Sequence, residues 1–419
     1  MKTKINRIFK NPMLIVLLLV LILFTPQGLY SPGQSREIAV VVALGFDFAP
    51  EGYEVSLLTF IPKANQTFKE VNSVVSGKGE NISQALYNAQ IALGKRVGLS
   101  HVQTTVLSEQ LLKENVPSIV DYLTRLAALS SSTVFIGTNG SAKELLSLSS
   151  KLEDGIGLDL EQVIGFNSVR IFSSETSLEE FYKGFYGRSH SSLIGYLPVI
   201  EGEENKQGSI IAEGATSGGG SISDSGVEGE GGNSGGKEKS KYILNSGQAV
   251  LLKNGEMVEL LSLEQVNSIN LINNNTKGQI IRIDDAEIDG ETHNISYRIR
   301  EKSVKIATKF ENGYPVLQAN INLGMELMEI NGQHQDLVVR SEFSNLTPEI
   351  ISKIEYKLRK EFKEVVDILQ KNSADVLGVG DLFFKYRRKE YLSFIKNLES
   401  EDAFIKDVLF QLKFNIEPN

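Results

Sequence analysis

The sequence contains no cysteine. This absence excludes disulfide bonds, thiolate zinc sites, iron–sulfur clusters, a cysteine nucleophile and a lipid attached through cysteine. Histidine is scarce as well, and the four that occur lie far apart in the chain: His101, His190, His293 and His334. A metal site built from several histidines is therefore not expected, and most of the usual catalytic chemistry is excluded.

A surplus of basic residues is also missing. Lys and Arg number 43 against 52 Asp and Glu, which gives a formal net charge of -9, so we expect no nucleic-acid partner. The sequence has no nucleophile elbow, P-loop, zinc-protease motif, Rossmann fingerprint or EF-hand loop. Gly77-Lys78-Gly79 is interpreted as a turn before a helix. We therefore predict no enzymatic activity, no cofactor and no metal site.

The N-terminus carries a basic segment followed by an apolar run. Lysine and arginine are the only charged residues within 1–12, and an uninterrupted apolar stretch fills 13–24. This order is typical of an export signal or of an anchor that stays in the membrane. Because no small-x-small cleavage site follows the run, we expect an uncleaved anchor over 13–30, with residues 1–12 in the cytoplasm. A cleaved signal peptide is the alternative.

A long segment in the middle of the chain is poor in apolar residues. Residues 214–240 contain ten glycines and six serines, so the segment cannot bury enough surface to fold by itself. Residues 201–240 hold eight acids and three lysines, more than half of the net charge. We predict that residues 201–241 form an acidic, flexible linker between two folded parts that are themselves nearly neutral.

Residues 34–200 have the pattern of a mixed α/β domain. Four segments have strand-like composition: 36–46, 53–61, 102–107 and 133–137. Asn81 is placed to cap a helix whose apolar residues recur at helical spacing. Residues 141–144 have the pattern of a capping box that opens a further helix.

After the linker the pattern is antiparallel. Asn254-Gly255 lies between two apolar runs and is a strong hairpin signal, and Asn312-Gly313 marks a second turn in a longer connection. Thr347-Pro348-Glu349 opens a helix with an apolar stripe of about six turns. Residues 408–416 alternate again and predict a closing strand. The predicted fold is α+β and multi-domain, with mixed, mostly antiparallel sheets and packed helices behind an N-terminal membrane anchor.

Three positions could take part in catalysis or ligand binding, and a purely structural role is the alternative for each. His101 lies between a helix and a strand, but no nucleophile or orienting partner is recognisable beside it, so we expect a structural or capping role. Arg125 could hold a carboxylate bidentately, although a structural salt bridge is the expected role. Residues 375–381 are rich in glycine and begin and end with aspartate. They predict a tight, conformationally special turn, with calcium binding as the less favoured alternative.

The segments also occur in an informative order. Arg36-Glu37 leads into a strand that ends with Gly45-Phe46-Asp47, and a helix, His101 and a strand follow. Asp375-Val-Leu-Gly-Val-Gly380 after a long helix is the most specific pattern. In this order and spacing the sequence resembles the Ger(x)C family, the C subunits of bacterial spore germinant receptors. The resemblance implies structural or interaction roles for nine residues: Arg36, Glu37, Gly45, Asp47, His101, Arg125, Asp375, Gly378 and Gly380.

The resemblance implies a non-enzymatic subunit of a nutrient germinant receptor that faces outward from the spore inner membrane. Its partners would be integral membrane subunits, one A-type and one transporter-like B-type, and contact with the nutrient would be indirect. Family precedent also implies a small middle β domain over 242–294 and a C-terminal α+β domain over 295–419. A single sheet continuous through both halves would refute that division.

Two features depart from the family pattern. Members usually carry a lipobox cysteine just before the arginine–glutamate pair, so here the apolar N-terminal segment would have to provide the anchoring. The long Gly/Ser insert is also unusual. Either departure is compatible with a divergent or repurposed paralogue. Two alternative interpretations stay open: an anchored binding or scaffold protein of the cell envelope unrelated to germination, and an exported hydrolase whose active site lacks a named motif.

Overall fold

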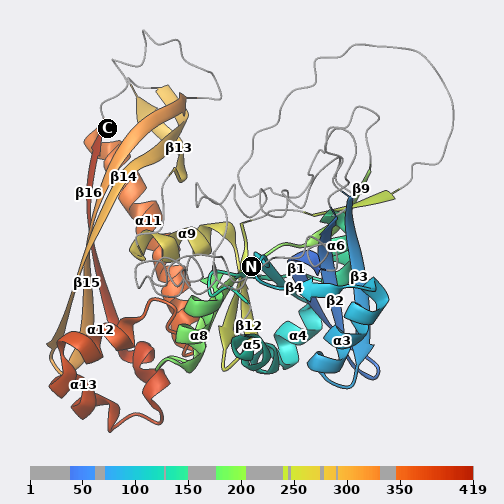
Figure 1. Cartoon of the computed structure of the whole chain (residues 1–419). Coiled ribbons are helices and arrows are strands. Elements are labelled where there is room, and N and C mark those ends of the chain that lie inside the picture. Colours follow the sequence, from blue (N-terminus) through green and yellow to red (C-terminus); the bar gives the residue numbers. More distant parts are fainter. Residues whose placement is uncertain are drawn as a thin grey trace, which may run out of the picture.

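The computed structural model contains two large β-sheets joined through a shared core, together with one pair of strands that stands apart (Figure 1). It describes residues 38–61, 71–126, 129–149, 176–203, 239–243, 247–273, 278–288, 291–330 and 346–418. The expected anchor at 13–30 and the motif residues Arg36 and Glu37 lie outside this part of the chain. Within it, no helix is both long and apolar enough to cross a bilayer.

The larger sheet has ten strands, and its main path runs in the order β12-β11-β8-β6-β5-β1-β2-β3. The strands are β1 (Ile38–Ala49), β2 (Gly52–Ile61), β3 (Val71–Gly79), β4 (Arg96–Gly98), β5 (Thr104–Leu107), β6 (Val134–Gly137), β7 (Thr176–Ser177), β8 (Ser191–Tyr196), β11 (Ala249–Lys253) and β12 (Glu256–Leu261). The central strands β1, β5, β6 and β8 are parallel, and both ends of the sheet are antiparallel. β5 and β8 are buried at every residue, as expected for central strands covered on both faces.

Strands from both sides of the predicted linker belong to this one sheet. β8 precedes the linker and β11 follows it, yet the two pair antiparallel along five residues, from Ser191↔Lys253 to Gly195↔Ala249. The predicted middle domain over 242–294 therefore has no sheet of its own, because β11 and β12 extend the N-terminal sheet and β13 joins the second one. The two ends of the linker also pair with each other, as β9 (Val199–Glu203) and β10 (Lys239–Ile243).

Helices cover both faces of the ten-stranded sheet. One face packs against α3 (Ile82–Leu93), α4 (Glu109–Glu114), α5 (Val116–Arg125) and α8 (Leu178–Tyr186), and the other carries α6 (Ala142–Ser149). Asn81 caps α3 as predicted, since its Oδ1 accepts a hydrogen bond from Gln84 N at 2.9 Å. The segment predicted as a turn at 77–79 is the end of β3. A Cβ at Gly77 would lie 2.1 Å from Ala89 N, so glycine allows α3 to lie against this strand.

The smaller sheet has four strands in the order β13-β14-β15-β16. They are β13 (Ile280–Ile288), β14 (Glu291–Glu311), β15 (Tyr314–Ile330) and β16 (Leu409–Pro418). Asn312 and Gly313 form a two-residue turn between β14 and β15, with φ angles of 51° and 84°, rather than part of a longer connection. β16 closes the sheet as predicted but runs parallel to β15, whereas the sequence predicted an antiparallel pattern.

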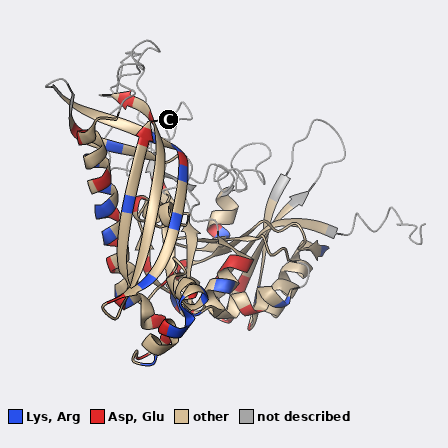
Figure 2. Cartoon of the chain, turned by 90° about the vertical axis from the view of Figure 1, so that its left-hand side faces the viewer, with Lys and Arg blue, Asp and Glu red and all other residues tan. Residues whose placement is uncertain are grey.

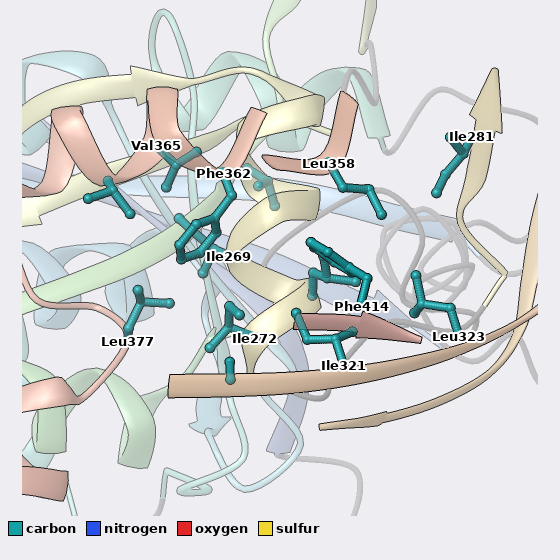
Figure 3. Packing of buried hydrophobic residues seen from close by; sticks show 14 of the residues in the cluster. Ile269, Ile272, Ile281, Ile321, Leu323, Leu358, Phe362, Val365, Leu377 and Phe414 are labelled. Atoms are coloured by element: carbon teal, nitrogen blue, oxygen red, sulfur yellow. The ribbon is translucent and has the colours of Figure 1, made fainter. Parts of the chain in front are cut away.

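The long helix α11 (Pro348–Lys371) packs against the four-stranded sheet. It begins where the sequence predicts, because Thr347 Oγ1 accepts a hydrogen bond from Ile350 N at 3.3 Å. Its apolar stripe is buried from end to end: Ile350, Ile354, Leu358, Phe362, Val365, Val366 and Leu369. Figure 3 shows Leu358 and Phe362 in one cluster with Ile321 and Phe414 of the sheet.

Cationic side chains beside this stripe reach the backbone at both edges of the sheet. Lys353 and Lys357 donate hydrogen bonds to Asp285 O and Arg282 O on β13. On the opposite edge, Arg359 donates to Leu412 O on β16 at 2.6 Å. These contacts attach α11 to the backbone of both edge strands. One helix therefore fills the core of the small sheet and also holds its two edge strands.

A continuous apolar core joins the two sheets. The helix α9 (Leu263–Ile272) is buried at every residue from Val266 to Ile272 and packs against α11. The same cluster includes Leu193 and Leu251 of the ten-stranded sheet. The chain beyond α11 adds α12 (Val379–Tyr386), α13 (Arg388–Ile395) and the 3-10 helix η3 (Glu401–Asp407). Because the core crosses from one sheet to the other, the two halves hold a defined relative position.

Candidate functional site

The glycine-rich segment after α11 forms the special turn that the sequence predicts. Asp375 is 7% exposed, and its carboxylate accepts hydrogen bonds from Val379 N at 3.0 Å and Gly380 N at 2.8 Å. These are among the first amides of α12, which have no partner within the helix. Burial raises the pKa of Asp375, and the amide hydrogen bonds act in the opposite direction. Among the described residues there is no group of three His, Cys, Asp or Glu side chains that could hold a metal ion.

The two motif glycines of this turn have different roles. Gly378 has φ +67°, a conformation that L-residues rarely adopt, and it stands at the N-cap position of α12. Gly380 lies in the first turn of α12, where an added Cβ would be 3.6 Å from Asp375 Oδ2, an ordinary contact. Backbone conformation therefore requires glycine at position 378, whereas position 380 contributes its amide to the cap.

A second buried aspartate caps a helix in the N-terminal half. Asp47, near the end of β1, accepts hydrogen bonds from Ala142 N at 2.7 Å and Lys143 N at 3.0 Å at the start of α6. Gly45 lies two residues earlier, and a Cβ there would come within 2.8 Å of Leu146 Cδ1. Gly45 therefore lets α6 approach the strand, and Asp47 fixes its N-terminus. Burial raises the pKa of Asp47, and the backbone hydrogen bonds oppose this effect.

The Asp375 turn lines a cleft between the two halves of the protein. The cleft has a volume of about 280 Å³ and is lined by α8 and β8 on one side and by α9 and the 375–381 turn on the other. Two buried serines in its wall, Ser191 and Ser192, donate hydrogen bonds to the carbonyls of Ser189 and Phe181. Asn270 of α9 also lines the cleft and is 8% exposed. The most specific family motif thus lies where the halves meet.

Charged side chains connect the halves beside this cleft, and we call Arg188, Lys253, Asp381, Glu401 and Asp402 the clamp. Arg188 follows α8, and its guanidinium contacts Glu401 Oε1 at 2.5 Å and Asp381 Oδ1 at 3.2 Å. The same group stacks on the ring of Phe384, 3.6 Å from the ring centre. Lys253 on β11 is 8% exposed and pairs with Asp402 Oδ2 at 2.6 Å. The 375–381 turn, α12 and η3 are therefore fixed to the ten-stranded sheet by charge as well as by apolar packing.

The two remaining predicted positions lie away from the cleft. His101 is exposed in the turn between β4 and β5, and among the described residues its side chain has no serine or carboxylate partner. Arg125 pairs with Asp121 one helical turn earlier, at 2.9 Å, with 76% of its side chain exposed. The predicted salt bridge is confirmed, and such an exposed pair contributes about 0.3–0.5 kcal/mol. Among the described residues, neither side chain has the partners that acid–base or nucleophilic catalysis needs.

The clamp could not be predicted from the sequence. Arg188 lies in a short loop and its partner Glu401 is 213 residues away, so no local spacing connects them. Lys253 lies in a strand that the sequence assigned to a different domain. The available signal was the position of Lys253 in an apolar strand, because a lysine buried in such a strand needs an acidic partner.

Comparison with known proteins gives a family match for each half of the chain. Residues 34–201 match the family described as "Spore germination protein N-terminal domain", and residues 246–417 match "Spore germination B3/ GerAC like, C-terminal". The chain is 20% identical over 426 residues to Spore germination protein KC of Bacillus subtilis (strain 168), across 97% of this chain and 93% of the relative. It is 25% identical over 147 residues to the Putative spore germination protein YfkR of the same organism, across 32% of this chain and 37% of that protein. The crystal structure of the GerBC protein aligns with a TM-score of 0.43 and 15% identity, across 89% of this chain and 96% of that one.

The two family matches cover both halves and leave out the acidic insert between them. The first match contains Gly45, Asp47 and the loop with Arg188, and the second contains the Asp375 turn. Family members belong to receptor complexes with other subunits and are not enzymes, in agreement with the structural roles of the motif residues. This chain therefore belongs to the Ger(x)C family, the non-enzymatic C subunits of bacterial spore germinant receptors.

Proposed function

We propose that this protein is a membrane-anchored germinant receptor subunit that acts in receptor assembly and in relay of the germination signal. The observation that carries the proposal is the match of both halves to the family, in order and around the insert. The structural roles of Asp47 and Asp375 add to it, because each carboxylate caps the N-terminus of a helix.

The anchoring part of the proposal concerns residues outside the described chain. Because the sequence has no cysteine to carry a lipid, the apolar stretch 13–24 would hold the protein in the spore inner membrane, with the folded part facing outward. Integral membrane subunits of A-type and transporter-like B-type are the proposed partners. The junction of the two halves is the proposed relay element, because the family turn, the cleft and the clamp meet there. Contact with the nutrient germinant would be indirect.

Fractionation of dormant spores tests this function. We expect the full-length protein in the inner membrane of dormant spores, released only by detergent, and co-purified with the two integral membrane subunits. Deletion of its gene should abolish dipicolinate release in response to one class of nutrient, and the intact gene should restore it. A shortened form found mainly in vegetative cells would contradict the proposal and favour the envelope scaffold alternative.

A further inference from the structure

One short segment of the C-terminal half has a charge opposite to that of the whole protein. The chain has a net charge of -9, whereas residues 385–396 contain five cations and a single acid. The cations are Lys385, Arg387, Arg388, Lys389 and Lys396. In a net acidic protein, such a concentration of positive charge on one site points to an anionic partner.

This segment forms a convex corner of the molecule. It contains the end of α12 and all of α13, which lie at the lower left of Figure 1, and Figure 2 shows basic residues on the lower end of the molecule. The inner side of the corner is fixed by aromatic packing, because Tyr391 is fully buried and Phe394 contacts Phe310 and Phe404. The outer side is therefore presented to solvent on a rigid base.

The five cations are exposed. None of them forms an ion pair with another described residue. The Nε of Arg387 donates to Thr308 O at 2.8 Å, while Lys385 and Arg388 lie over the rings of Tyr386 and Phe384. Their positive charges are thus available to an outside partner.

Apolar side chains project from the same surface. Tyr386 is 62% exposed and Leu392 is 39% exposed. Arg388 and Leu392 of α13 and Lys396 at its C-cap, which also has helical backbone angles, follow at intervals of four residues, so the leucine lies between two cations on one helical face. An exposed tyrosine and leucine among lysines and arginines is the composition of surfaces that rest in the headgroup region of a bilayer.

We propose that the corner formed by residues 385–396 docks on a bilayer surface that contains anionic lipid. A convex corner fits a plane better than it fits a peptide, and the cleft described above is lined by other residues. The docking rests on the proposed membrane anchoring, which would hold the folded part next to a bilayer. It would fix the orientation of the C-terminal half, and with it the cleft and the clamp, relative to the membrane.

The absence of tryptophan from the chain gives a direct test. Tyr386→Trp places the sole tryptophan at the corner, and Tyr87→Trp on α3 is a matched control because both tyrosines are 62% exposed. Each full-length variant is reconstituted into vesicles of phosphatidylcholine, with or without phosphatidylglycerol, that carry bromine-labelled acyl chains. We expect strong quenching and a blue shift for Tyr386→Trp in the anionic vesicles, reversed by salt, and none for Tyr87→Trp.

A charge-neutralised variant separates electrostatic docking from burial of the new tryptophan. Lys385→Gln, Arg388→Gln and Lys389→Gln are added to Tyr386→Trp, and Arg387 is kept because it bonds to Thr308 O. Each removed cation lowers the docking equilibrium about fivefold, so the triple change lowers it about a hundredfold and removes the quenching. Unchanged thermal unfolding checks that the fold is intact.

The possible outcomes distinguish docking from anchoring. Incorporation into vesicles without quenching of Tyr386→Trp would overturn the docking and leave the anchoring intact. No incorporation into either kind of vesicle and no fluorescence change would overturn both. A fluorescence shift that requires a co-reconstituted receptor subunit instead of anionic lipid would identify an acidic protein surface as the partner and would overturn the lipid docking.

Discussion

At the scale of the residue, the two buried aspartates explain which motif positions matter. Asp47 and Asp375 each replace the missing hydrogen-bond partners of two helix amides, one through a strand 95 residues away and one from the adjacent turn. A buried carboxylate is costly unless it is saturated with donors. The motif therefore includes the glycines that bring the helix amides within hydrogen-bonding distance of the two carboxylates. Because both carboxylates accept these hydrogen bonds, they are not free to act in catalysis.

Gly378 gives the sharpest test at this scale. Its φ is +67° and no atom lies within 4 Å of the position that a Cβ would take, so a side chain would meet backbone strain but no clash. We expect Gly378→Ala to lower the free energy of unfolding by about 1 kcal/mol and Gly378→Val by about 2, with Gly378→Asn milder than either. Urea unfolding measures the differences.

Gly140→Ala is the matched control for these variants. Gly140 does not have a positive φ, and its nearest neighbour would be Glu144 Oε2 at 3.6 Å, so the added methyl should leave stability unchanged or raise it slightly. Equal stability of Gly378→Val and the parent protein would show that the turn relaxes without the left-handed conformation.

At the scale of the element, the sequence predicts the turns and helix starts that a few adjacent residues determine. The hairpin turn at 254–255, the presence of a turn at 312–313, the cap of α3 and the start of α11 are confirmed, because each depends on a few adjacent residues. These local signals do not predict the length of β14, which runs from Glu291 to Glu311. A register shift between Ile299 and Glu301 changes which residues face the core, so a strict alternation could not continue through it.

The contact between α9 and α11 predicts a pH dependence. Glu361 on α11 has its pKa raised from the usual 4.5 to about 6, first by burial and then by Glu264 and Glu364, with Lys357 and Lys360 acting in the opposite direction. Between pH 4.5 and about pH 6, the folded state therefore binds more protons than the unfolded chain. Stability from this residue is therefore lost as the pH rises from 4.5 to 6, and the loss persists at neutral pH.

Replacement of Glu361 removes the ionisation responsible for this loss. We expect Glu361→Gln to raise the free energy of unfolding by about 1 kcal/mol at pH 7 and to have no effect at pH 4, where the carboxyl is already neutral. Asp367→Asn, on the exposed side of the same helix, should change little at either pH. A gain of equal size at both pH values would assign the effect to packing rather than to charge.

At the scale of the whole molecule, the halves are interlocked rather than linked in series. One family match ends before the insert and the other begins after it. The second half nevertheless supplies β11 and β12 to the sheet of the first half. No sequence signal marks this exchange, because the pairing of β8 with β11 depends on the tertiary fold. The composition of the insert predicts a boundary between two domains. In the structure, the insert instead lies between two strands of the larger sheet, β8 and β11.

Cleavage of the insert tests the interlocking directly. A specific protease site placed within 214–230 would divide the chain between β8 and β11. We expect the two fragments to stay associated in native buffer and to separate only in denaturant, because the β8–β11 ladder and the shared core cross the cut. Capture through a tag on one fragment, followed by gel electrophoresis, measures the association.

Arg188→Ala removes two charged contacts and the stacking on Phe384, so it should weaken the association of the cleaved fragments by about 2 kcal/mol, roughly thirtyfold. Arg125→Ala, which loses only an exposed pair within one helix, should leave it unchanged. Spontaneous separation of the fragments would show instead that the insert joins independent domains.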